Sequence, residues 1–396
     1  MVEEGRGEKM DIETKIALVK RHPTAEVVTE EDLRNLFENE EHPVAYDGFE
    51  PSGLAHLGSG LLRAIKLDDL IKAGVRFKFL VADQFALLND KMGGDLQAIR
   101  EVGKYLVSVW EACGVDLSKV EVVWSSEVFK DPEYWETVLK VVRNVTVNRL
   151  TRAVTVLGRR EGEVATASRL FYPAMQCADI FYLNVDICQL GYDQRKANIL
   201  ARDIGEKIGF WKPVCVHHEL LIGLQGPTKM GGLPFNKPDK PDKSDRSDLS
   251  NLSEREEREE REEKEEERQS QVKMSKSFPD TCVFVHDAPE EVERKIKNAF
   301  CPPKQTTENP ILEILKFIIF RKSRKFELER PRKFGGTETY FSFDELEAAY
   351  RKGEIHPLDL KLNVSTALNE ILEPVRAYFE RRPELLEVFK KQEVTR

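Results

Sequence analysis

The chain has 396 residues, of which 40% are hydrophobic and 33% charged, and its formal net charge is −9. This length allows two or three domains with substantial cores, and no apolar run approaches the roughly 20 residues that a membrane-spanning helix needs. Residues 1–6 have neither the basic nor the apolar stretch of a secretory signal, so we expect a cytoplasmic protein without membrane contact. The six cysteines form no C-x-x-C pair, which predicts reduced thiols and no protein-bound metal.

The first part of the chain is predicted to be helical and the next part to alternate strands with helices. Residues 1–40 indicate a helical extension of two amphipathic helices, separated at His22-Pro23, the second beginning near Thr29. Strands are then expected at 44–49, 75–82, 120–124 and 214–217, and helices at 57–73 and 95–114. This alternation is typical of a doubly wound α/β domain with a parallel sheet, whose ligands bind outside the carboxyl ends of the strands.

From about residue 287 the pattern becomes helical, which predicts a separate all-α domain at 287–396. Helices are expected at 289–300, 309–319, 343–352 and 362–379, and the apolar residues of the last recur at helical spacing. Between the two domains lies a highly charged segment, 237–272, without an apolar stripe. We interpret it as a surface insertion, with an interaction arm as the alternative.

Basic side chains cluster in two regions despite the negative net charge. One cluster lies within 316–333, and the other holds Arg143, Arg149, Arg152, Arg159, Arg160 and Arg169. Such clusters are either solvated faces or contacts for nucleic acid, and charge alone does not separate the two.

Two short segments indicate the chemistry. His56-Leu57-Gly58-Ser59 places an imidazole and backbone N–H groups at the expected start of a helix, where phosphates bind. Lys273-Met274-Ser275-Lys276-Ser277 carries two lysines on one loop, from which both can reach a single polyphosphate. Either segment alone is also explained by ordinary surface residues. Together, and in this order, they predict activation of a carboxylate by ATP.

With three further segments, these motifs resemble the class I aminoacyl-tRNA synthetases, and among them the tyrosyl-tRNA synthetases of the archaeal and eukaryotic type. Residues 56–59 correspond to the HIGH motif, with Ser59 in place of its second histidine, and 273–277 to the KMSKS loop. The further segments are 172–179 (YPAMQCAD), 191–195 (GYDQR) and 356–361 (HPLDLK). The resemblance implies a Rossmann-like catalytic domain at 41–286, with a connective segment at about 125–170, and an anticodon-binding domain at 287–396.

A pocket for tyrosine has to recognise the phenolic hydroxyl, because only that group distinguishes tyrosine from phenylalanine. The resemblance implies that Asp179 and Tyr46 bind it. Tyr172, Gln176 and Asp179 lie at i, i+4 and i+7, and therefore on one face of a helix. Ordinary packing is the alternative for Tyr46 and Tyr172, and an exposed carboxylate for Asp179. The pocket that the resemblance implies consists of Tyr46, Gly48, Glu50, Tyr172, Gln176, Asp179 and Gln194.

The resemblance also implies how ATP is bound. The reaction needs positioning and electrostatic stabilisation of the departing pyrophosphate, without a covalent enzyme intermediate. Mg²⁺ is expected to accompany ATP as part of the substrate. The expected ATP-binding residues are His56, Gly58, Lys273, Ser275 and Lys276, and the expected catalytic residues are His56, Ser59, Lys273 and Lys276.

The second substrate implied by the resemblance is tRNA(Tyr). Phe334 and His356 would stack on the first anticodon base, as single-stranded bases are generally bound, and Asp359 would accept its hydrogen bonds. The alternatives are a core position for Phe334 and a helix cap for His356 or Asp359. The family also implies a homodimer. Two other functions remain open from the residues, a tryptophanyl-tRNA synthetase and a non-catalytic tRNA-binding paralogue.

Overall fold

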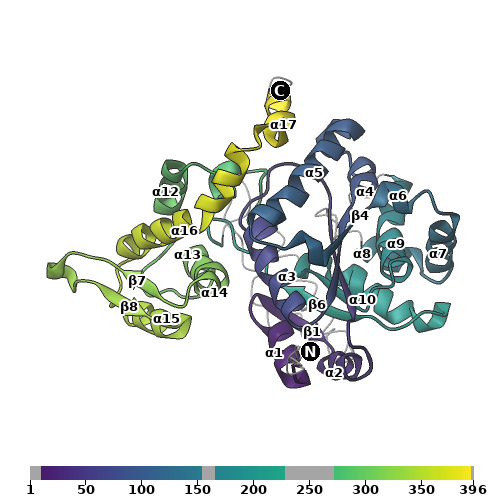
Figure 1. Cartoon of the computed structure of the whole chain (residues 1–396), viewed down its shortest axis with the longest axis horizontal. Coiled ribbons are helices and arrows are strands. Elements are labelled where there is room, and N and C mark those ends of the chain that lie inside the picture. The colour runs from purple at the N-terminus through teal and green to yellow at the C-terminus, as the bar shows by residue number, and fades with distance from the viewer. Residues whose placement is uncertain (1–9, 154–165, 228–271, 394–396) are drawn as a thin grey trace, which may run out of the picture. The chain divides into compact units, whose positions relative to one another are not determined.

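The computed structural model describes residues 10–153, 166–227 and 272–393, and the chain divides into two compact units (Figure 1). Unit 1 comprises residues 1–52 and 63–219, and unit 2 comprises residues 53–62 and 220–396. Segment 53–62 belongs to unit 2 because it hydrogen-bonds to it, Leu57 N to Val283 O and Val285 N to Ala55 O, each over 3.0 Å. The predicted functional domains 1–40, 41–286 and 287–396 stay a prediction.

Unit 1 contains a six-stranded sheet in the order β1-β6-β5-β2-β3-β4. All neighbours run parallel except β1, which is antiparallel to β6 at one edge. The prediction of an α/β fold with a mostly parallel sheet is confirmed. The chain passes from β2 to β3 and β4 on one side and later to β5 and β6 on the other, which makes β2 and β5 the topological switch point. The strands are β1 Thr24–Val28, β2 Val44–Phe49, β3 Arg76–Val81, β4 Val120–Trp124, β5 Ile187–Gly191 and β6 Val214–His218.

The prediction that residues 1–40 are purely helical is wrong, because they also contain a strand. Between α1 Ile12–Lys20 and α2 Glu30–Asn39 lies β1, whose Val27 and Val28 pair with Val216 and Cys215 of β6. The β-branched residues there favour a strand once an open sheet edge is available, which a helical reading of the segment does not consider. Thr29 does begin the second helix, because its hydroxyl accepts from the Asp32 N–H over 3.1 Å.

The remaining elements of unit 1 connect these strands. Asp95 and Asp131 cap the two helices α5 and α7 through backbone N–H groups of their first turns. The elements are α3 Arg63–Lys72, α4 Asp83–Leu88, η2 Lys91–Gly94, α5 Leu96–Ala112, η3 Leu117–Lys119, α6 Ser125–Val128, α7 Pro132–Arg143, α8 Val147–Ala153, α9 Ala167–Tyr182, η6 Tyr192–Gln194, α10 Arg195–Ile204 and η7 Glu206–Ile208.

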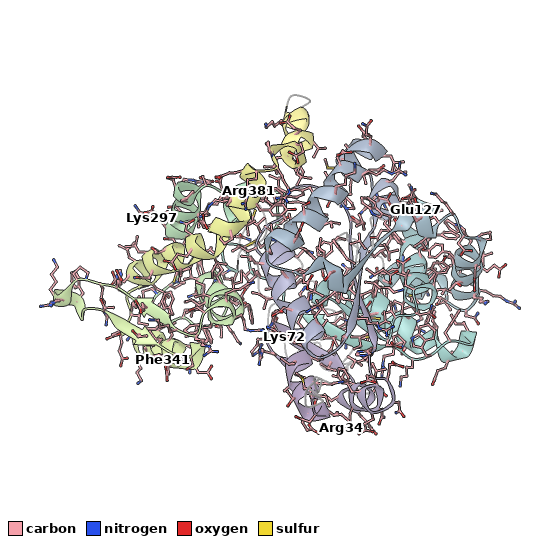
Figure 2. All side chains as sticks on the ribbon, viewed as in Figure 1. Arg34, Lys72, Glu127, Lys297, Phe341 and Arg381 are labelled. Atoms are coloured by element: carbon pink, nitrogen blue, oxygen red, sulfur yellow. The ribbon has the colours of Figure 1, made fainter. Side chains whose placement is uncertain are left out.

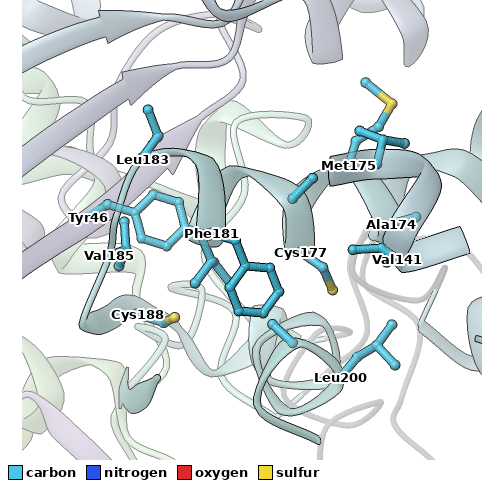
Figure 3. Close-up of a cluster of buried hydrophobic side chains, with 14 of the residues drawn as sticks. Tyr46, Val141, Ala174, Met175, Cys177, Phe181, Leu183, Val185, Cys188 and Leu200 are labelled. Atoms are coloured by element: carbon cyan, nitrogen blue, oxygen red, sulfur yellow. The ribbon is translucent and has the colours of Figure 1, made fainter. Parts of the chain in front are cut away.

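Two apolar clusters hold unit 1 together. Trp110 of α5 stacks on Phe79 of β3, with ring centroids 4.0 Å apart, and meets Phe49 edge-on. The second cluster packs α9 against β2, β5 and α10, and Figure 3 shows Tyr46 and Cys188 from the strands beside Phe181 from the helix. This packing places α9 beside β2 and β5, the switch point of the sheet.

Unit 2 is helical, but not all-α as predicted. Phe326 and Leu328 of β7 are buried while Glu327 is exposed, and this alternation forms a two-stranded antiparallel sheet with β8. Within the described residues, no helix is long and apolar enough to cross a membrane. The elements are η1 Gly58–Leu62, η10 Pro279–Thr281, α12 Pro289–Asn298, α13 Pro310–Ile314, η11 Leu315–Ile319, α14 Phe320–Lys322, β7 Phe326–Leu328, η12 Arg332–Phe334, β8 Glu338–Tyr340, α15 Phe343–Lys352, α16 Pro357–Glu380, η13 Pro383–Leu386 and α17 Glu387–Glu393.

Candidate active site

The predicted amino-acid pocket begins on β2, at the switch point of the unit 1 sheet. Tyr46 is 1% exposed, and its Oη atom has no hydrogen-bond partner among the described residues. Burial, with a contribution from the Asp179 charge, raises the pKa of this phenol well above its ordinary value. A buried hydroxyl without a partner is costly, which makes Tyr46 a candidate for binding a ligand.

Helix α9 provides three predicted side chains on one face, as their spacing indicates. The Tyr172 hydroxyl donates to Glu50 Oε1 over 2.6 Å, and Gln176 Nε2 donates to Gln194 Oε1 over 3.3 Å. The structure therefore joins Tyr172 to Glu50, and Gln176 to Gln194. Gln176 Oε1 is a second buried polar atom without a partner among the described residues.

Asp179 is the third of these side chains, and a residue that the sequence did not predict contacts it. Its carboxyl is 2% exposed and accepts a hydrogen bond from Tyr134 Oη over 3.0 Å. Burial raises the pKa of Asp179 well above its ordinary value, and the bond from Tyr134 acts in the opposite direction. Tyr134 lies on α7, far from any motif. Its place beside the apolar Val138 and Val141 on the buried face of that helix was the one available signal.

Glu50 is held by two further residues that no motif indicated. Asn89 Nδ2 donates to both carboxylate oxygens over 3.2 Å, and Lys91 Nζ lies 3.5 Å from Oε2. With Tyr172 these contacts fix a negative charge immediately after β2. Gly48 lies on β2 shortly before Glu50 and packs against Leu80 of β3. The nearest Leu80 atom would lie 3.8 Å from a Cβ added at Gly48.

A charged network anchors the residue that follows Gln194. Arg195 donates from Nε (2.8 Å) and Nη2 (3.0 Å) to Glu26 of β1, and His217 Nδ1 lies 2.8 Å from the same carboxylate. Burial alone would raise the pKa of Glu26, but the bonds from His217 and Arg195 outweigh it and lower this pKa to about 2. Glu26 therefore stays ionised at neutral pH and holds the start of α10.

The predicted phosphate-binding segments both lie in unit 2. His56 forms a β-bridge with Phe284, and its Nδ1 accepts from the Gly58 N–H over 3.1 Å. In a neutral imidazole the proton then sits on Nε2, which is a donor. The Gly58 N–H is used by His56 itself. Ser59 Oγ likewise accepts from the His56 N–H (3.1 Å) and donates to the His56 carbonyl (3.3 Å).

The lysine loop is tied at its upstream end and lies against a glycine. Lys273 forms a β-bridge with Ile222, whose N–H donates to Glu313 Oε2 of α13 over 2.8 Å. Lys276 lies over Gly53, where an added Cβ would come within 3.2 Å of Lys276 Cδ. Gly53 also has a φ of +135°, so only glycine suits this close approach. Ser275 Oγ accepts from the Ser277 N–H over 3.3 Å within the loop.

The predicted anticodon residues are surface residues of unit 2. Phe334 is 59% exposed, which excludes the core alternative, and Lys333 Nζ lies 4.8 Å from its ring centroid. His356 is the cap of α16, because its Nδ1 accepts from the Leu358 N–H over 3.2 Å. Asp359 stands in the first turn and is not the capping residue. Within the described residues, no hydrogen bond, ion pair or ring contact joins these three side chains to one another.

Some predicted features lie outside the described residues. These are Arg159 and Arg160 of the basic cluster and all of the charged segment 237–272 except Val272.

In the ranges that the structure does describe, no group of three or more His, Cys, Asp or Glu side chains could hold a metal ion.

Comparison with known proteins identifies the family of the chain. The model of the family "tRNA synthetases class I (W and Y)" matches residues 38–232 and 266–373. The tyrosine–tRNA ligase of Pyrococcus horikoshii is 42% identical over 402 residues, which cover 98% of this chain and all of the relative. That of Saccharolobus solfataricus is 42% identical over 383 residues, 96% of this chain and 97% of the relative.

Solved structures of the same family are similar to the chain over most of its length. The crystal structure of Pyrococcus horikoshii tyrosyl-tRNA synthetase complexed with L-tyrosine has a TM-score of 0.83 and covers 96% of this chain and 100% of its own. The Leishmania major enzyme in complex with tyrosinol, 35% identical, has a TM-score of 0.78 and covers 97% of this chain and 66% of its own. The chain therefore belongs to the class I tRNA synthetases, and within them to the tyrosine–tRNA ligases.

Proposed function

We propose that this chain activates L-tyrosine with ATP to tyrosyl-AMP and pyrophosphate, and then transfers the tyrosyl group to the 3′ adenosine of tRNA(Tyr). The observation that carries this proposal is the set of buried polar groups at the switch point of unit 1. Tyr46 Oη and Gln176 Oε1 have no partner among the described residues, and Asp179 has a buried carboxyl. The relative from Pyrococcus horikoshii has been solved with L-tyrosine, which supports a tyrosine pocket here.

Recognition of tyrosine then follows from these groups. Asp179 and Tyr46 bind the phenolic hydroxyl, and phenylalanine is rejected because it would leave both without a partner. Gln176, Gln194 and Tyr172 bind the α-amino end, where the ammonium group is a donor that Gln176 Oε1 can accept from. Gly48 and Glu50 form the floor of the pocket.

The phosphates of ATP are bound by residues of unit 2. The tyrosine carboxylate attacks the α-phosphorus, and negative charge accumulates on the departing pyrophosphate. His56 donates from Nε2, and Lys273 and Lys276 neutralise the β- and γ-phosphates, with Mg²⁺ entering as part of the ATP substrate. Ser275 belongs to the same loop. Gly58 and Ser59 contribute by holding the His56 turn, because their polar groups bond to His56.

The experiment that tests the function is ATP–pyrophosphate exchange with tyrosine, phenylalanine and tryptophan in turn. We expect exchange with tyrosine alone. Exchange with tryptophan in its place would assign the chain to the tryptophanyl enzymes, and absence of exchange with all three would indicate a non-catalytic tRNA-binding protein.

Recognition of the anticodon can be tested separately at Phe334. We expect Phe334→Ala to raise the KM for tRNA(Tyr) roughly tenfold to a hundredfold, because stacking of an aromatic ring on a base contributes about 1–3 kcal/mol. Pyrophosphate exchange, which needs no tRNA, should be unchanged. Phe341→Ala is a matched control, since this ring of unit 2 is 69% exposed and is labelled in Figure 2. Equal losses in both variants would contradict a specific role for Phe334. His356 and Asp359 are the other residues proposed to recognise the anticodon.

We further propose that the protein is a cytoplasmic homodimer. Large apolar side chains are exposed on α7, α8 and α9, namely Trp135, Leu139, Val147 and Phe171, on helices that pack against one another. Large apolar side chains exposed on neighbouring helices are typical of a subunit interface. Sedimentation should therefore give twice the mass of the chain, and Leu139→Glu should shift it to the monomer, whereas a wild-type monomer would contradict the proposal.

The basic residues Arg143, Arg149, Arg152 and Arg169 are candidates for tRNA contacts in the same region.

A further inference from the structure

Tyr134 is a fully buried tyrosine whose hydroxyl meets the carboxyl proposed to select the substrate. It lies on α7 with an exposure of 0%, and its Oη is 3.0 Å from Asp179 Oδ1 and 3.4 Å from the Met175 carbonyl oxygen. Within the described residues, this is the one hydrogen bond made to the Asp179 side chain. The shorter distance marks the carboxyl as the main acceptor of the Tyr134 proton.

Surrounding rings hold Tyr134 in this position. Phe129 stacks on it with ring centroids 5.0 Å apart and an interplanar angle of 22°, and Tyr182 packs edge-on at 5.5 Å. The ring of Tyr182 makes this contact, whereas its hydroxyl is directed elsewhere and donates to Asp131. The Tyr134 hydroxyl is therefore an oriented donor that reaches Asp179 at a defined oxygen.

The bond determines what Asp179 can offer to a ligand. Tyr134 Oη donates to Oδ1 and thereby occupies that oxygen. No described residue hydrogen-bonds to Oδ2, which leaves that oxygen to the hydroxyl of a bound tyrosine. Burial raises the pKa of Asp179, and the bond from Tyr134 opposes that shift. Because hydrogen bonds to an ionised carboxylate are about twice as strong as neutral ones, the bond from Tyr134 favours the stronger contact with the hydroxyl of tyrosine.

We propose that Tyr134 is a positioning residue for substrate selection: it holds Asp179 as an oriented acceptor for the phenolic hydroxyl of tyrosine. This inference rests on the proposed function, and it adds a residue that reaches the substrate only through Asp179. Loss of the Tyr134 hydroxyl leaves a buried carboxyl with fewer donors, which favours its neutral form and frees it to rotate.

The test is the selectivity between tyrosine and phenylalanine in pyrophosphate exchange. Tyr134→Phe keeps the ring and its packing and removes only the hydroxyl. We expect kcat/KM for tyrosine to fall roughly tenfold to a hundredfold, as for loss of a hydrogen bond to a charged group, while kcat/KM for phenylalanine stays the same. Tyr182→Phe is the matched control, because it removes a neighbouring hydroxyl that bonds to Asp131 and should leave the selectivity unchanged.

The outcomes separate this inference from the proposed function. If the wild type shows no tyrosine-dependent exchange, the function itself is wrong. If Asp179→Asn reduces selectivity and Tyr134→Phe does not, Asp179 acts without Tyr134 and the inference is overturned. Equal losses for both amino acids in Tyr134→Phe, with a lowered melting temperature, would also overturn it, because they would show a purely structural role.

Discussion

Replacement of Lys276 by alanine is expected to slow the formation of tyrosyl-AMP by roughly 10²- to 10³-fold, the usual cost of removing one group that stabilises charge in a transition state. The affinity for tyrosine should hardly change, because the residues proposed to bind tyrosine belong to unit 1 and Lys276 to unit 2. Single-turnover formation of the adenylate measures the first quantity, and equilibrium dialysis with labelled tyrosine measures the second.

The control for Lys276 is another lysine that can be removed without consequence for the reaction. Lys72 of α3, labelled in Figure 2, is an exposed residue paired with Asp68 over 2.5 Å. Lys72→Ala should leave both adenylate formation and tyrosine affinity at the wild-type level. A Lys276→Ala variant that forms adenylate at the wild-type rate would refute the role of the lysine loop in pyrophosphate stabilisation.

Replacement of Asp179 by alanine is expected to remove the preference for tyrosine over phenylalanine. The kcat/KM for tyrosine should fall by at least roughly tenfold to a hundredfold, because the hydroxyl of a bound tyrosine would lose its carboxyl acceptor inside the protein. The value for phenylalanine should fall little or even rise, since it loses no partner. Pyrophosphate exchange with both amino acids over a range of concentrations measures the two values.

The conservative variant Asp179→Asn separates charge from shape in the same experiment. It keeps the size of the side chain and an oxygen acceptor, and should therefore retain more activity with tyrosine than the alanine variant. If alanine and asparagine reduced the activity with both amino acids to the same extent, the carboxylate would be needed for folding of the pocket and not for selection.

The parts of the fold that the sequence predicted well are those with strong local patterns. The apolar runs of β2, β3 and β4 and the cap of α2 are recognisable from neighbouring residues alone. Strand β5, with only five residues, was missed, as was β1. Both depend on partner strands that are distant in the chain, and tertiary pairing decides such short segments. For the same reason the β7–β8 pair was not predicted.

The candidate site shows the same division. Tyr172, Gln176 and Asp179 could be placed on one helix face from their spacing, and the motif residues of unit 2 from resemblance. The contacts that hold them could not, because Tyr134 and Asn89 come from other elements, and the position of Tyr134 on the apolar face of α7 indicates burial but not its partner. Likewise, the bonds that occupy Gly58 and Ser59 depend on the conformation of a single turn, which residue types do not specify.

The pairing of Glu26 with Arg195 means that the N-terminal segment cannot be treated as a removable extension. A shortened version of the protein that starts at β2 would expose the edge of β6 and leave Arg195 and His217 without their shared carboxylate. A truncation made for crystallisation should therefore remove only residues before α1, and a fused reporter should be joined before α1. A library that randomises the tyrosine pocket to accept other amino acids should also include Glu26 on β1, since it binds Arg195, the residue that follows Gln194.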